Sequence, residues 1–269
     1  MGGFFGFFDY SKAGKGVRKD EPKRSHFAQF WILTQRKFWQ IMQLNLLFLL
    51  FCVPIVTIGP AMAGMTYVLR QFAAENPVFL LSDFWDNFKS NFKQSFAFGL
   101  LQTVFAIIIA YSVQFYFINA PQNMWMYLTL GFSIMVTLLA IFASFYVYLM
   151  IVTLDLKLIA IIKNSLIFAV LCMRTNFITL FFLIVVYGVT FIFFPMSMLL
   201  VLTILFSFTN FIICYNSYPH IRKYAIEPYL ESLREQADAE SGAEPQSDES
   251  ENENVFSDEF KKSPWDKDQ

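Results

Sequence analysis

Residues 38–64, FWQIMQLNLLFLLFCVPIVTIGPAMAG, decide the fold, because no charged residue interrupts them. An apolar stretch of about 18 or more residues without charge is typical of a membrane span. Pro54 and Pro60 fall within the stretch, and each proline removes a backbone donor and obstructs a regular helix. The sequence therefore predicts a first membrane helix over Phe38–Val53 that turns or kinks at Pro54.

The chain as a whole is too apolar for a soluble protein of 269 residues: 56% of it is hydrophobic, 15% is charged and the mean hydropathy is +0.47. Charge is distributed unevenly, since eight Lys and Arg residues precede Phe38 and most acidic residues follow Ala225. Loops rich in Lys and Arg stay on the cytoplasmic side of a membrane. We therefore expect a multi-pass protein of the cell membrane with a cytoplasmic N-terminus and the lipid bilayer as its surroundings.

The basic residues also predict the number of crossings. Lys or Arg occurs in the connections at 70–93, at 157–174 and from 222 onwards, whereas the connections at 119–123 and around Pro195 contain none. If all basic connections share one side, further spans are expected near 95–118, 125–152, 176–194 and 196–215. Residues 58–74 then either cross back as the second arm of a Pro-broken hairpin or form a re-entrant unit, and we favour the hairpin. The expected fold is all-α, with about six crossings and both termini cytoplasmic.

Two further segments are expected to be amphipathic helices at the inner face. In residues 82–96, SDFWDNFKSNFKQSF, phenylalanine recurs every fourth residue, which is the period of one helix face, and Ser82 is a plausible N-cap. Residues 157–174 are apolar but carry Lys163 in their middle, so they are more typical of an interfacial helix than of a span. The pattern K-[QN]-S-[FL]-x-F occurs at 93–98 and at 163–168, which suggests the hypothesis of a parallel internal repeat.

Three domains are expected from composition. Residues 1–29 form a basic, aromatic cytoplasmic arm, and residues 30–224 form the helical membrane domain, which Pro219 is expected to end. Residues 225–269 form an acidic cytoplasmic tail with almost no aliphatic residues. Apart from one short helix near 229–237, such a tail is expected to be disordered.

The stretch KFWQIMQLNLLFLLFCVPIVTIGPAMAGMTYVLR, followed by FWDNFKSNFKQSFAFG, resembles the YesL-like family of bacterial integral membrane proteins, also called domain of unknown function 624. The resemblance runs from about Phe30 to Arg222. It implies no established activity, but members of that family are commonly encoded beside carbohydrate uptake systems of the ATP-binding-cassette type. It also implies an inner-face signature, formed here by Lys89, Asn91, Lys93, Lys163 and Asn164.

No motif of enzymatic chemistry is present. The sequence lacks a Walker A loop, a Gly-rich dinucleotide fingerprint, HExxH and GxSxG, and its only histidines are His26 and His220. Its three cysteines show no metal-ligand spacing, and the basic arm precedes a span rather than belonging to a nucleic-acid-binding module. We therefore expect no enzyme activity, no catalytic residue, no metal, no cofactor and no nucleic-acid partner.

Two groups of residues are candidates for function inside the membrane. The helix break with Pro54, Gly59, Pro60 and Gly64 either lines a site, as broken helices do in transporters, or is a tight turn with close backbone packing. The uncharged polar residues of the spans either line a polar path or bond helices together, and helix-to-helix bonding is the commoner role. These residues are Asn45, Gln102, Gln114 and Asn210.

The expected function is that of an accessory or regulatory membrane component linked to carbohydrate uptake, with an ATP-binding-cassette permease as its partner. This expectation depends on the family context, the two interfacial helices and the charged tail. One alternative is a permease or pore for a neutral solute, built around the Pro54–Gly64 break. The other is a membrane scaffold.

Overall fold

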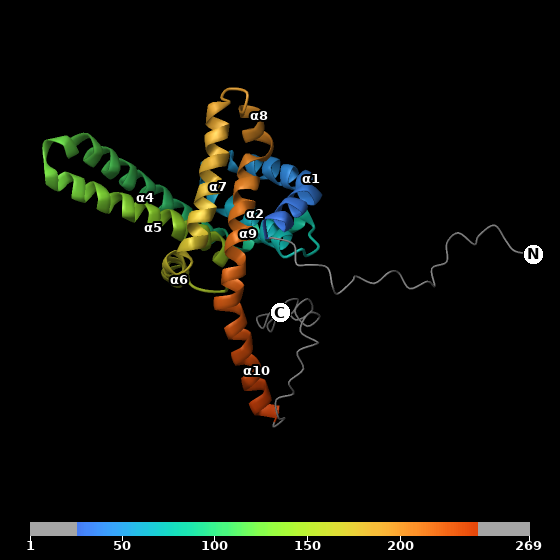
Figure 1. Ribbon diagram of the computed structural model, residues 1–269. Helices are drawn as coiled ribbons and strands as arrows, with labels where there is room; N and C mark the ends of the chain where they lie inside the picture. Colours follow the sequence, from blue (N-terminus) through green and yellow to red (C-terminus); the bar gives the residue numbers. More distant parts are fainter. Residues whose placement is uncertain (1–25, 242–269) are drawn as a thin grey trace, which may run out of the picture. The chain divides into compact units, whose positions relative to one another are not determined.

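The computed structural model describes residues 26–241, and these residues form helices without any strand (Figure 1). The all-α prediction is confirmed. The chain divides into two compact units, residues 1–218 and residues 219–269, which are described separately. The elements are α1 (His26–Cys52), the 3-10 turn η1 (Ile55–Thr57), α2 (Ile58–Ala73), α3 (Leu80–Ser90), α4 (Phe92–Asn119), the 3-10 turn η2 (Ala120–Gln122), α5 (Met124–Ile151), α6 (Leu158–Leu171), α7 (Met173–Ile192), α8 (Met198–Leu200), the π-helical turn η3 (Val201–Leu205), α9 (Phe206–Ile221), the π-helical turn η4 (Arg222–Ile226) and α10 (Glu227–Ser241).

The apolar helices indicate a polytopic membrane protein, as expected. Within the described residues, four helices are long and apolar enough to cross a membrane: α4, α5, α7 and the helix of Met198–Glu235. The expected count of about six is therefore not reached, because α1 and α2 do not meet these criteria. With 16 residues, α2 is about 24 Å long, which is less than the ~30 Å of hydrocarbon. Its length favours the re-entrant alternative over a complete second crossing.

The first two helices form a hairpin that Pro54 breaks, as the sequence predicts. α1 ends at Cys52, since the nitrogen of Pro54 has no hydrogen to donate to the last turn. The hydroxyl of Thr57 donates instead to the carbonyl of Phe51, and also to that of Pro54 at 2.6 Å. Beyond this turn, α2 packs against α1, α3, α4 and α5, and most of its side chains are buried. It is the central helix of the first unit.

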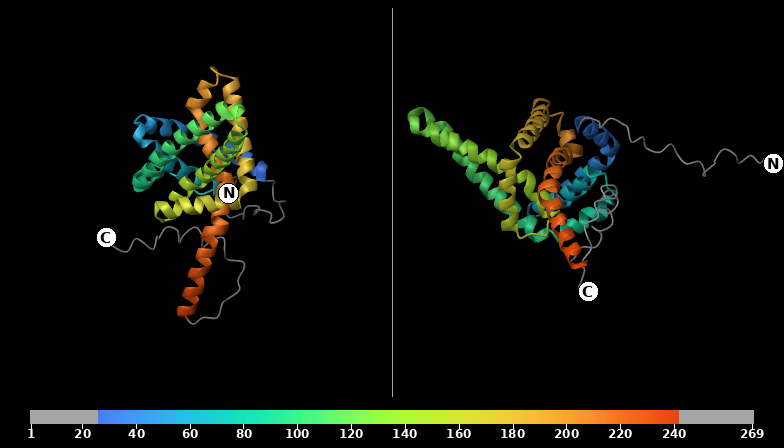
Figure 2. Two further views of the ribbon diagram at one scale, coloured as in Figure 1. Left: turned by 90° about the vertical axis from the view of Figure 1, so that its left-hand side faces the viewer. Right: turned by 60° about the horizontal axis from the view of Figure 1, so that its bottom comes forward.

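Helices α4 and α5 form a long hairpin that extends away from the rest of the first unit. They lie side by side in every view, and their connecting turn lies far from α7 (Figures 1 and 2). Only the second half of α5 is buried, from Phe142 to Ile151, and it packs on α2, α6 and α7. The helical pair is therefore held at one end and exposed along the remainder of its length.

Several predicted boundaries are wrong. α1 begins at His26, well before Phe38. The expected helix over 82–96 is divided at Asn91, and Ser82 is not its N-cap, because the helix begins at Leu80 and the carboxylate of Asp83 accepts the N–H of Phe79 at 2.9 Å. Pro219 itself does not interrupt the helix, since it lies within α9 and the wider π-helical turn η4 carries the chain on into α10. The first compact unit nevertheless ends directly before it, at Tyr218.

In the second unit, α10 is longer than the short helix expected over 229–237. An ion pair joins Arg222 to Glu227 at 3.5 Å across the start of this helix. The predictions for the N-terminal arm before residue 26 and for the acidic tail after residue 241 lie outside the described residues.

The hypothesis of an internal repeat needs a different register. Residues 93–98 lie in α4, whereas residues 163–168 lie in α6, so the matched letters do not occupy equivalent elements. The elements themselves do repeat, because α3 and α6 are each a short helix separated by a single residue, Asn91 or Cys172, from a long helix. Counted from these breaks, equivalent positions are buried in both halves: Phe84, Phe88, Ser95 and Phe98 correspond to Ser165, Ala169, Asn176 and Thr179.

Candidate functional site

The Pro54–Gly64 break is a place of close packing. A Cβ atom at Gly59 would lie 2.3 Å from the carbonyl oxygen of Ser95 in α4, and one at Gly64 would lie 2.8 Å from the carbonyl oxygen of Phe84 in α3. Both distances are shorter than a van der Waals contact allows. Pro60 is buried beside Gly59, whereas Pro54 is exposed at the tip of the turn. The glycines therefore let α2 touch the backbones of α3 and α4, which matches the packing alternative for this break.

Asn45 is completely buried and joins α1 to the start of the apolar helix Met198–Glu235. Its Nδ2 donates to the carbonyls of Val201 at 3.3 Å and Leu202 at 2.9 Å, and its Oδ1 accepts the N–H of Ser207 at 3.0 Å. A π-helical turn such as η3 leaves neighbouring backbone groups without their α-helical partners. The carboxamide of Asn45 replaces those partners, so its role is to bond two helices.

Asn210 has a similar role between α9 and α2. Its Nδ2 donates to Oγ1 of Thr66 at 3.0 Å, and both residues are buried. The hydroxyl of Ser207 lies 3.3 Å from the sulfur of Met65 in the same contact. The two amides thus hold the 201–210 segment from two sides, Asn45 from α1 and Asn210 through Thr66 of α2, and neither lines the pockets described below.

Gln102 and Gln114 have different surroundings. Both lie on α4, both are exposed, and neither carboxamide has a hydrogen-bond partner among residues 26–241. They line an apolar groove of about 920 Å³ between α4, α5 and one side of α6. Of the four polar candidates, these two amides are therefore available to bind something else.

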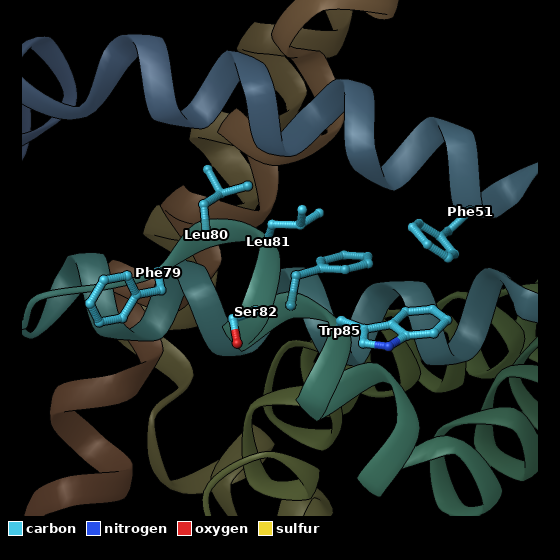
Figure 3. A pocket seen from close by; sticks show the side chains of 7 residues that line it. Phe51, Phe79, Leu80, Leu81, Ser82 and Trp85 are labelled. Atoms are coloured by element: carbon cyan, nitrogen blue, oxygen red, sulfur yellow. The ribbon is translucent and has the colours of Figure 1, made fainter.

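A second, smaller pocket lies between the end of α1 and the start of α3. It measures about 760 Å³ and is lined by Phe51, Phe79, Leu80, Leu81, Ser82, Phe84 and Trp85. Phe51 of α1 lies opposite Trp85 of α3, with ring centroids 5.4 Å apart, and Phe79 lies at the other end (Figure 3). Phe79 is 80% exposed and Leu81 is 66% exposed. We refer to these seven residues as the aromatic pocket.

Charged groups surround the aromatic pocket on α3. The ammonium of Lys89 lies 4.4 Å from the centroid of the Trp85 ring, while Asp83 and Asp86 are held by the N–H of Phe79 and the hydroxyl of Ser82. A large apolar surface with a polar rim is typical of a protein or membrane contact. Sequence reasoning expected the α3 helix, but it did not predict that Phe51 of α1 completes a pocket with it.

The predicted inner-face signature divides into two groups. Lys89, Asn91 and Lys93 surround the junction of α3 and α4, where Nδ2 of Asn91 donates to the carbonyl of Asn87 at 3.3 Å. Lys163 and Asn164 lie on α6, with Lys163 exposed. In the described part of the chain, no hydrogen bond or ion pair connects the two groups, and none of the three lysines has an ion-pair partner.

Arg70 joins the end of α2 to the end of α5, a structural role that the sequence did not predict. Its Nη1 donates at 3.0 Å to both the carbonyl of Val152 and Oγ1 of Thr153, and its guanidinium lies 4.7 Å from the Tyr67 ring centroid. The C-terminus of a helix carries partial negative charge, so the end of α5 is a suitable partner for a cation. The sequence feature that could have indicated this role is its position, since Arg70 directly follows the uncharged residues 38–69.

The described residues contain no group of three or more His, Cys, Asp or Glu side chains that could hold a metal ion. His26 packs against Tyr215, with ring centroids 4.5 Å apart, and Cys172 and Cys214 are buried free thiols. The geometry of the first unit therefore offers surfaces for binding, namely the aromatic pocket and the α4–α5 groove.

Comparison with known proteins bears on the family alone. No curated protein and no solved structure matches the chain. Residues 41–113 match the family model described as "Protein of unknown function, DUF624", and this segment contains the α1–α2 turn, α2, α3 and most of α4. The match includes Asn45, the Pro54–Gly64 break and Gln102. The family resemblance is thus confirmed over residues 41–113, where the chain is similar to the DUF624 family.

Proposed function

We propose that this protein is a non-enzymatic accessory component of a carbohydrate uptake system in the cell membrane, and that it binds the permease of that system through the aromatic pocket. The observation that carries the proposal is the exposure of Phe79 and Leu81 beside buried Phe84, on a helix that also presents Lys89. The link to carbohydrate uptake comes from the family resemblance.

The aromatic pocket has the properties of a binding hot spot. Aromatic residues are enriched at the energetically dominant centres of protein interfaces, where an apolar anchor of the partner fills a pocket and a polar rim excludes water. Phe51, Phe84, Trp85 and Phe88 already support one another, with ring centroids between 5.2 and 6.2 Å apart. Such a preorganised surface loses little side-chain entropy on binding.

The packing of the Pro54–Gly64 break favours this function over the alternative of a permease or pore. A solute path would need space or unpaired polar groups near the break, but Gly59 and Gly64 contact backbone atoms and Asn45 and Asn210 are fully engaged. Neither the aromatic pocket nor the α4–α5 groove has a residue of Pro54–Gly64 in its lining.

Replacement of Leu81 by serine or of Phe79 by alanine is expected to reduce binding of the permease about tenfold, a loss typical of an interface anchor. Both side chains are exposed, so the fold should be unaffected. The measurement is copurification in mild detergent from the native membrane, with quantification of the permease subunit of an ATP-binding-cassette carbohydrate system. Phe191→Ala is the matched control, because Phe191 is 84% exposed on α7 and outside the pocket. The proposal is contradicted if the permease subunit does not copurify with the unchanged protein. It is also contradicted if liposomes that contain this protein alone take up sugar.

The proposal places the α3 helix and both termini in the cytoplasm. The basis is the positive-inside rule applied to the eight basic residues before Phe38 and to Lys89 and Lys93. A cysteine introduced at exposed Ser90 should react with a membrane-impermeant maleimide only after the cells are opened. Of two reporters fused after Gln269, one active only in the cytoplasm and one active only outside it, the first alone should be active. Labelling of Ser90→Cys in intact cells contradicts this orientation.

A further inference from the structure

The groove between α4, α5 and α6 shares no lining residue with the aromatic pocket, so its occupant does not depend on the proposed function. Only 6% of the most apolar part of α4 is buried, against 50% for α5, so α4 is exposed along nearly its whole length. The groove is lined by apolar side chains of α4 and α5 and by Ile162 and Leu166 of α6. If only the apolar side chains of the groove mattered, acyl chains of lipids would fill it.

The two carboxamides argue against lipid as the occupant. Gln102 lies about 15 Å along α4 from Phe92, well inside the depth of the hydrocarbon for a helix of 28 residues. Two other polar side chains at membrane depth on α4 have partners, because Thr103 and Ser112 donate to carbonyls of their own helix at 2.8 and 2.9 Å. Gln102 and Gln114 have no partner in the described residues. An unpaired polar group in hydrocarbon is costly, and acyl chains offer neither a donor nor an acceptor.

We propose that the groove binds a second copy of this chain, so that two α4–α5 hairpins pack into a four-helix bundle. Two copies with the same membrane orientation are related by an axis along the membrane normal, and equivalent residues then lie at the same depth. A carboxamide has both a donor and an acceptor, so Gln102 pairs with Gln102 of the other copy. Ala106 and Ala110 on α4 and Ala140 on α5 lie along the groove and allow close approach of the helices.

Cysteine cross-linking tests the contact directly. Gln102→Cys in native membranes is expected to give a covalent dimer of twice the 31.3 kDa chain mass after mild oxidation. Ile184→Cys on α7 is the matched control, because that side chain is 61% exposed but lies outside the groove, and it should stay monomeric. The unchanged chain gives the background of its own three thiols. A product with a different protein, or equal cross-linking at position 184, overturns the proposal.

Loss of the amides should weaken the dimer without unfolding the chain. The double variant Gln102→Leu and Gln114→Leu is expected to raise the dimer dissociation constant in liposomes by about tenfold, as counted by single-molecule photobleaching. Gln43→Leu repeats the substitution at an exposed amide of α1 outside the groove, and its dissociation constant should equal that of the unchanged chain. An unchanged protein that is monomeric at every density, or a double variant that dimerises normally, overturns the proposal.

Discussion

Replacement of Gly59 by alanine is expected to destabilise the protein by about 3 kcal/mol or more, the upper part of the range for overpacking a rigid site. The added methyl group would lie 2.3 Å from the carbonyl oxygen of Ser95 and 3.0 Å from its carbonyl carbon. These atoms belong to the backbone of α4, so no side-chain rotation can relieve the clash. α2 must move away from α4 instead, and Gly99, which would place its own Cβ 3.1 Å from the Cα of Gly59, loses the same contact.

The measurement is the midpoint of unfolding in detergent together with the amount of protein that reaches the membrane. Gly131→Ala and Gly188→Ala are the matched controls, because an added Cβ meets nothing within 4 Å at either position. Alanine is favoured over glycine in a helix by about 1 kcal/mol, so these two variants should be as stable as the unchanged chain or slightly more stable. The interpretation of Gly59 as a packing glycine is wrong if its alanine variant behaves like the controls.

Asn45→Leu is expected to destabilise the first unit by about 3–5 kcal/mol. The substitution removes the two N–H donors of the carboxamide, which serve the carbonyls of Val201 and Leu202, and the oxygen that accepts the N–H of Ser207. Each buried backbone group that loses its partner costs about 1–3 kcal/mol, and leucine offers no compensating hydrogen bond. No water is available at membrane depth to replace the lost contacts.

The control for Asn45→Leu is Gln43→Leu, which converts an exposed amide of the same helix to the same residue and should change the unfolding midpoint little. A second measurement separates local from global effects. If Asn45 is the bond between α1 and η3, amide hydrogen exchange in its leucine variant should accelerate first near Val201–Ser207. Uniformly unchanged exchange with an unchanged midpoint would show that the bond contributes nothing.

The same two residues show how far sequence reasoning reaches for the candidate sites. Asn45 was recognised as a polar residue in an apolar helix, and helix-to-helix bonding was its commoner expected role. Its partners lie more than 150 positions away along the chain. They were not predictable, because the π-helical turn at Val201–Leu205 leaves no signature in a run of ordinary apolar residues. Likewise, the aromatic period of α3 was evident, but the contribution of Phe51 to its pocket depends on how two separate helices pack.

The sequence by itself determined that this chain is an all-helical membrane protein, that residues 41–113 are similar to the DUF624 family and that a proline breaks its first hairpin. These properties follow from local quantities, namely the length of uncharged runs and the missing N–H of proline, and they need no knowledge of distant contacts. Only the tertiary structure decided that Gly59 and Gly64 are packing positions, and that Asn45 is hydrogen-bonded while Gln102 has no hydrogen-bond partner among residues 26–241. Identical residue types acquire different roles there because burial and hydrogen-bond pairing are set by which helix faces meet, and that depends on the whole chain at once.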